Sequence, residues 1–71
     1  MNRNTADQIQ RLMLQVAGLL DEFVVAIDAD GHEQERRRYR RFVGRTLSQI
    51  HDEVLVPIHE QFPDLKPAQL K

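Results

Sequence analysis

The stretch IQRLMLQVAGLLDEFVVAI, residues 9 to 27, decides the fold of this chain. Its apolar residues recur at alternating steps of four and three positions, which is the spacing of one face of an α-helix. A second apolar row runs beside the first and consists of Leu12, Leu19 and Ala26. So wide a face suits a helix with neighbours on two sides, as in a four-helix bundle. With Thr5 and Gln8 in the pattern of a capping box, we expect a helix over about 5–29.

The next segment, DADGHEQERRRYRR at residues 28 to 41, predicts a turn between two helices. Gly31 can adopt the left-handed conformation that ends a helix. Asp30 and Glu33 fit a capping box for the helix that follows. A turn of about 30–32 is short, and short connections favour antiparallel neighbours.

A second helical stripe follows the turn, and we expect its helix over about 32–62. Its apolar residues again share one face and are Tyr39, Phe42, Val43, Leu47, Ile50, Val54 and Ile58. Pro57 lacks a backbone donor and clashes with the preceding turn, so it must kink or break this helix. We favour a kink, with Pro63 ending the helix and residues 63–71 forming a C-terminal tail.

The predicted fold is all-α: one unit over residues 1–71, built as an antiparallel two-helix hairpin that dimerises into a four-helix bundle. A chain of 71 residues can build only a core of marginal stability by itself. Because it has no cysteine, no disulfide can add stability, so self-association is the expected source of the remainder. In the number, length and pairing of its helices the arrangement resembles the Rop-type architecture, and no residue roles are carried over from it. The expected core and dimer interface comprises Ile9, Leu12, Met13, Val16, Leu19, Leu20, Phe23, Ile27, Tyr39, Val43, Leu47, Ile50 and Val54.

Charge and hydrophobic patterning narrow the classes of partner. The formal net charge of −1, with 30% charged residues, argues against a nucleic-acid duplex as the bulk ligand, because such ligands favour strongly basic domains. The start of the chain lacks a cationic stretch followed by an apolar core, so no signal peptide is expected. The longest apolar runs are far too short for a membrane span. We therefore expect a cytoplasmic protein without a membrane partner.

Motifs for metal binding fail on spacing. If Gly31 were the sixth residue of an EF-hand loop, Ala26 and Arg37 would stand where calcium requires acids. His51 and His59 share a helix face, but eight residues span about 12 Å along the axis, too far to chelate one ion. A metal shared across a dimer axis is the remaining alternative. No metal or cofactor is expected.

Catalysis has equally little support. Ser48, His51 and Asp52 lie close together in the sequence. On one rigid helix they cannot form the line of nucleophile, base and orienting group that a hydrolase needs, and mid-helix amides are not free to hold an oxyanion. We expect a protein that is not an enzyme.

An arginine cluster is the strongest candidate for a binding role. The candidate partner-binding residues, on the side away from the apolar stripe, are Arg37, Arg38, Arg41 and Arg45. From residue 28 to residue 45 there are six arginines against four acids, and Glu33 and Glu35 are placed one turn before Arg37 and Arg38. Tyr39 is expected in the core, so it is not free to stack on a base.

The function that fits best is a small non-catalytic homodimeric protein-interaction module, which acts as an adaptor, inhibitor or regulator of another protein. Arginine is favoured at protein interfaces, so a protein partner ranks above nucleic acid. The alternative is a small nucleic-acid-binding regulator that uses the arginine row. The sequence does not identify the partner.

Overall fold

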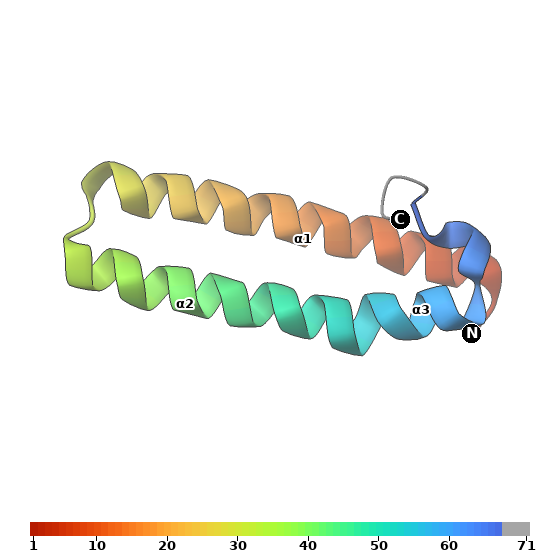
Figure 1. Ribbon diagram of the computed structural model, residues 1–71. Coiled ribbons are helices and arrows are strands. Elements are labelled where there is room, and N and C mark those ends of the chain that lie inside the picture. Colours follow the sequence, from red (N-terminus) through yellow and green to blue (C-terminus); the bar gives the residue numbers. More distant parts are fainter. Residues whose placement is uncertain (68–71) are drawn as a thin grey trace.

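Two long helices run side by side in opposite directions and make up most of the molecule (Figure 1). The computed structural model describes residues 1–67, so the last four residues of the expected tail lie outside the described residues. α1 spans Arg3–Asp30 and α2 spans Glu33–Ile50. A π-helical turn at His51–Leu55 continues into α3, Val56–Gln61, and a 3-10 turn follows at Pro63–Leu65. The predicted all-α antiparallel hairpin is confirmed.

The first helix begins at Arg3, two residues before the expected start. Asn2 is the N-cap, and its side-chain oxygen accepts the backbone N–H of Thr5 at 2.8 Å. The expected capping box of Thr5 and Gln8 is therefore wrong. Asparagine outranks threonine as an N-cap, because its short side chain readily accepts a free amide of the first turn.

The turn keeps its glycine for a reason other than the expected one. Gly31 has φ −76° and ψ 151°, which is extended backbone, so the predicted left-handed conformation is wrong. Its N–H donates to the carbonyl of Ile27 at 2.7 Å. A Cβ at Gly31 would lie 2.7 Å from that same carbonyl oxygen, closer than real Cβ contacts allow. Glycine is required here because the two backbone segments approach so closely.

The second helix is capped two residues later than predicted. His32 is the N-cap of α2, and its backbone N–H donates to the carboxylate of Glu35 at 3.0 Å. The expected pair of Asp30 and Glu33 does not cap this helix, because Asp30 still belongs to α1. Glu33 and Glu35 both lie in the first turn of α2, where acids interact favourably with the helix dipole.

Pro57 does not break the second helix. The ribbon passes through it without interruption, because the turn directly before it is wider than an α-helical turn (Figure 1). In that turn the N–H of Val56 donates to the carbonyl of His51, five residues back. A regular α-helix would drive the proline ring into the carbonyl four residues back, and a π-helical turn gives the ring room. The helix ends at Gln61, before Pro63.

The buried core is small and is concentrated at the open end of the hairpin. Among residues 1–67 four hydrophobic residues are buried: Ala6, Val43, Ile58 and Leu65. Three of them, Ala6, Ile58 and Leu65, pack together where the tail folds back on α1. Of the predicted core and interface residues, Val43 is buried, Leu12 and Leu19 are exposed, and the others are half-buried. The hairpin alone therefore leaves much of its apolar stripe accessible.

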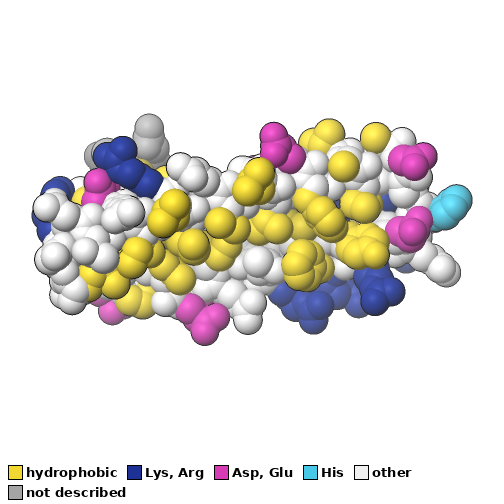
Figure 2. All heavy atoms as spheres, turned by 180° about the vertical axis from the view of Figure 1, so that it is seen from behind, with side chains coloured by type: hydrophobic (Ala, Val, Ile, Leu, Met, Phe, Trp, Pro, Cys, Tyr) yellow, Lys and Arg dark blue, Asp and Glu magenta, His cyan; other side chains and the backbone are white. Residues whose placement is uncertain are grey.

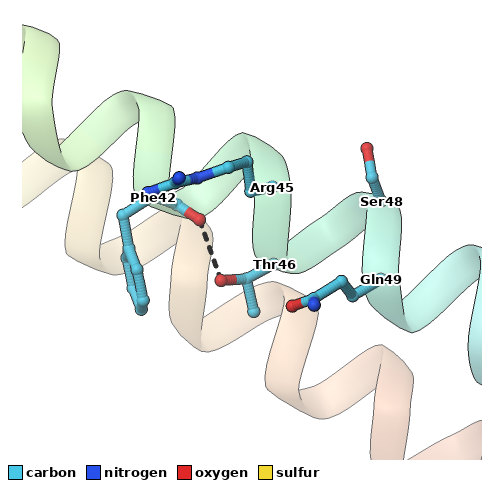
Figure 3. A pocket seen from close by; sticks show the side chains of 5 residues that line it. All are labelled: Phe42, Arg45, Thr46, Ser48 and Gln49. Carbon is cyan, nitrogen blue, oxygen red and sulfur yellow. Dashed lines mark hydrogen bonds between the residues drawn. The ribbon is translucent and has the colours of Figure 1, made fainter.

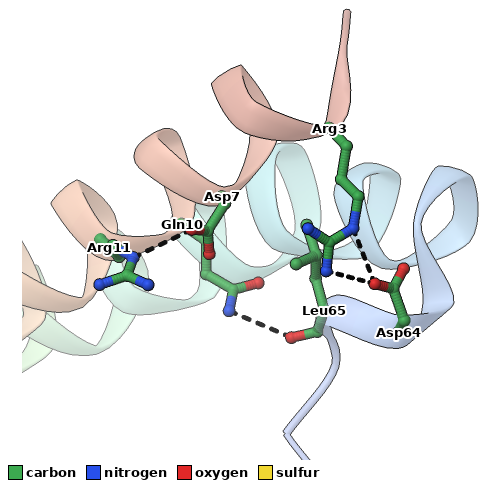
Figure 4. A network of polar contacts seen from close by, with 6 residues as sticks. All are labelled: Arg3, Asp7, Gln10, Arg11, Asp64 and Leu65. Atoms are coloured by element: carbon green, nitrogen blue, oxygen red, sulfur yellow. Dashed lines mark hydrogen bonds and ion pairs between the residues drawn. The ribbon is translucent and has the colours of Figure 1, made fainter.

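Polar contacts hold the tail in place (Figure 4). The side-chain amide of Gln10 donates to the carbonyl of Leu65 at 3.1 Å. Nε of Arg3 donates to the carboxylate of Asp64 at 2.8 Å. This hydrogen bond, together with the charge of Arg3, holds the pKa of Asp64 below its usual value. These contacts explain why a short segment after Pro63 covers Ala6.

Candidate protein-interaction face

One side of the hairpin carries a band of hydrophobic side chains that runs along most of its length (Figure 2). We call this side the Phe42 face and define it by Leu12, Leu19, Phe23 and Phe42. Each residue of an α-helix is rotated by about 100° from the one before it, so Leu12, Leu19 and Phe23 of α1 lie close together on one side of the helix, beside the core. Phe23 contacts Phe42 of α2 with ring centroids 6.2 Å apart, so the two helices contribute to the same surface.

The Phe42 face is open to solvent along its whole length. Leu12 is 46% exposed, Leu19 63% and Phe42 47%. Isolated exposed leucines are ordinary on a protein surface, but a continuous apolar band is typical of an interaction site. This band is the main candidate functional surface of the described chain.

Three aromatic rings form the centre of the band. Phe23 meets Tyr39 edge to face, with centroids 5.6 Å apart and an interplanar angle of 83°. Tyr39 is half-buried, and Phe42 is the more exposed member. Arg38 and Arg45 line the same shallow hollow as these rings. Aromatic and arginine side chains are the types that dominate binding energy at protein interfaces.

A second hollow continues along α2 from Phe42 (Figure 3). Phe42, Thr46 and Gln49 point to one side of the helix, whereas Ser48 points away from them. The hydroxyl of Thr46 donates to the carbonyl of Phe42 at 2.8 Å, so its proton is already engaged. The hollow therefore combines the ring of Phe42 with polar side chains, among them Arg45 and Gln49.

The opposite side of the hairpin is bridged and partly covered. Asp28 of α1 accepts two hydrogen bonds from Arg40 of α2, at 3.2 Å from Nε and 2.5 Å from Nη2. The hydrogen bond and the charge of Asp28 raise the pKa of Arg40 further above its usual value. The tail covers the open end, where Gln10 holds Leu65. The Phe42 face has no such cross-helix ion pair among residues 1–67.

The arginine row is divided by the structure. Arg37 is paired with Glu33, with Nη2 to Oε1 at 2.9 Å. The spacing predicted a pair between Glu35 and Arg38. The structure does not contain it, because the carboxylate of Glu35 accepts the backbone amide of His32. Within the described part of the chain, three exposed arginines have no acid at ion-pair distance: Arg38, Arg41 and Arg45.

The histidines make local polar contacts. His59 lies 2.7 Å from the side-chain oxygen of Gln10, which places it at the boundary of the core. His51 lies 3.0 Å from the carboxylate of the adjacent Asp52. In residues 1–67, no three histidine or acidic side chains come together in a way that could hold a metal ion. None of the described helices is both long and apolar enough to cross a membrane.

Two residues of this surface were missing from the predicted site. Phe42 belongs to the apolar stripe of the second helix but was not among the expected interface residues. Its neighbours give the signal that identifies it, since arginines stand four residues before it and three after it. Glu22 lines a hollow of α1 together with Leu19, and only the pairing of the helices places it beside the aromatic cluster.

Comparisons of the chain with protein-family models, with curated proteins and with solved structures found no match. The assignment of function therefore depends on the surface itself.

Proposed function

We propose that this chain is a non-catalytic protein-interaction module that works as a homodimer and binds a further protein as an adaptor, inhibitor or regulator. The observation that carries the proposal is the mismatch between a small buried core and a long open apolar face. Four buried hydrophobic residues are few for a chain of this length. Such a hairpin gains most of its stability when another surface covers its apolar stripe.

The exposed area supports the same proposal. The chain exposes 5716 Å², whereas a compact monomer of its mass exposes about 4,600 Å². The excess of roughly 1,100 Å² is comparable to the ~800 Å² that each partner buries in a standard protein interface. An area of this size suits a stable protein contact.

The charges of the described residues favour a protein partner over nucleic acid. Arg37 and Arg40 are each engaged by an acid of the same chain, and the whole chain carries a net charge of −1. Nucleic-acid affinity depends on many cations facing phosphates, and it falls steeply with salt. The remaining arginines border an apolar band, which is the composition of a protein-binding site.

Size-exclusion chromatography with light scattering tests the proposal on the intact chain. We expect twice the chain mass of 8.3 kDa at micromolar concentration. A folded monomer across that range would refute the homodimeric module. A shift of labelled RNA or DNA at low salt that is abolished by reversing Arg41 would instead support the nucleic-acid alternative.

A further inference from the structure

The Phe42 face has a defined charge pattern beside its apolar band. On α1, Glu22 stands next to Phe23 in the sequence and shares a hollow with Leu19. On α2, Arg38 and Arg45 flank the ring of Phe42. One edge of the face is therefore acidic at the level of the aromatic cluster, and the other edge is basic at the same level.

We infer that the Phe42 face is covered by a second copy of the chain, with both turns at the same end of a four-helix bundle. This inference rests on the proposed homodimer and specifies its face and polarity. In that arrangement the two-fold axis runs along the hairpin, so α1 of one copy lies antiparallel on α2 of the other. Because this axis is parallel to the helices, each residue lies at the same height along the bundle as its counterpart in the other copy.

The charges of the two edges then meet. Phe23 packs against both Tyr39 and Phe42, which fixes the height of the neighbouring Glu22 between Arg38 and Arg45. When the two-fold axis brings α1 onto α2, Glu22 of one copy lies between the two arginines of the other. Neither of these two arginines has an acid of the same chain at ion-pair distance in the described residues.

The opposite polarity lacks this complementarity. With the turns at opposite ends, α1 would lie on α1 and α2 on α2 of the other copy, so Glu22 would not meet Arg38 or Arg45. The other side of the hairpin is less suited to a second copy, because Asp28 and Arg40 bridge it and the tail covers its end.

A distance measurement tests the polarity, and the absence of native cysteine makes labelling selective. Gln34 is exposed at the turn, so a spin label on Gln34→Cys reports the separation of the two turns. We expect a distance within about 25 Å, because packed helices lie 8–10 Å apart. The opposite polarity would separate the labels by nearly the 44 Å length of the molecule.

Charge reversal tests the pairing. Glu22→Arg should raise the dimer dissociation constant about tenfold, because the two-fold axis repeats the contact and the substitution removes it at both places. The triple variant that adds Arg38→Glu and Arg45→Glu should restore dimerisation. Asp21→Arg is the matched control, since Asp21 is exposed about 100° away on α1, and it should leave dimerisation unchanged.

The outcomes separate this inference from the proposed function. A dimer with a long label distance, or a dimer that Glu22→Arg leaves unchanged, overturns the polarity and the face while the homodimeric module stands. A chain that remains monomeric overturns both. Helix content by circular dichroism confirms that each variant is folded, so a loss of dimer is read as a loss of the contact.

Discussion

Replacing Gly31 by alanine tests the account of the turn most directly. The backbone at Gly31, with φ −76° and ψ 151°, is a conformation that alanine adopts without strain. Without any steric obstacle, the substitution would stabilise the protein by roughly 0.4–1 kcal/mol, because alanine restricts the unfolded chain. In this turn the close approach of the backbone makes the same substitution destabilising instead.

The structure provides the magnitude of the reversal. The added Cβ would lie 2.7 Å from the carbonyl oxygen of Ile27 and 3.2 Å from its Cγ2. The carbonyl belongs to the helix backbone, so relief requires the turn to move and weakens the hydrogen bond from Gly31, worth about 1 kcal/mol. Inserting a methyl group where there is no space typically costs 1–3 kcal/mol. We expect Gly31→Ala to lower the free energy of unfolding by about 1–3 kcal/mol.

Gly44→Ala is the matched control, because nothing lies within 4 Å of a Cβ at that mid-helix position. It should raise the free energy of unfolding by about 1 kcal/mol, the helix-propensity difference between the two residues. Thermal and urea unfolding followed by circular dichroism, at one chain concentration, measures both changes. For a chain of this size, 1 kcal/mol corresponds to about 4–8 °C in Tm. A Gly31→Ala protein that is as stable as the parent would refute the close-approach argument.

Three further predictions concern the open end of the hairpin. Ile58→Ala removes a buried side chain and should cost about 2–5 kcal/mol of unfolding free energy, whereas Leu14→Ala on the exposed side of α1 should change it by less than about 0.5 kcal/mol. NMR titration of Asp64 should give a pKa below 3.8, and Arg3→Gln should raise that pKa. The stability that the pair contributes is present above pH 3.8 and is lost as the pH falls through the lowered pKa of Asp64. Asn2→Ala should lower the free energy of unfolding by about 1 kcal/mol in urea unfolding, because the amide of Thr5 loses its acceptor; an unchanged midpoint would contradict the cap.

Helical periodicity was sufficient to predict the hairpin. The stripe from Ile9 to Ile27 has one period throughout, and each helix is long enough for that signal to outweigh local exceptions. The N-cap was misplaced by three positions in the first helix and by two in the second, because several polar residues near a helix start compete for the same free amides. The choice among them depends on backbone geometry that the sequence pattern does not contain.

The packing at the open end was harder to predict. Leu65 lies outside both helical stripes, and it becomes a core residue because the chain reverses at Pro63 and places it over Ala6. The same limit applies to Phe42: periodicity places it at the edge of the stripe, and only the partner helix determines whether that edge is covered. Residues at the boundary of an amphipathic face depend on tertiary and quaternary neighbours.

The π-helical turn before Pro57 makes the chain sensitive to length at this point. A turn closed by a bond from Val56 to His51 holds one residue more than an α-helical turn. Deleting any one residue between 51 and 55 would restore α-helical spacing and would leave the residues downstream on the same helix face. Ile58 would keep its place beside Ala6 and Leu65, but the ring of Pro57 would then clash with the carbonyl four residues back, at a cost of about 3 kcal/mol. Substitutions within 51–55 should therefore be tolerated far better than a single-residue deletion there.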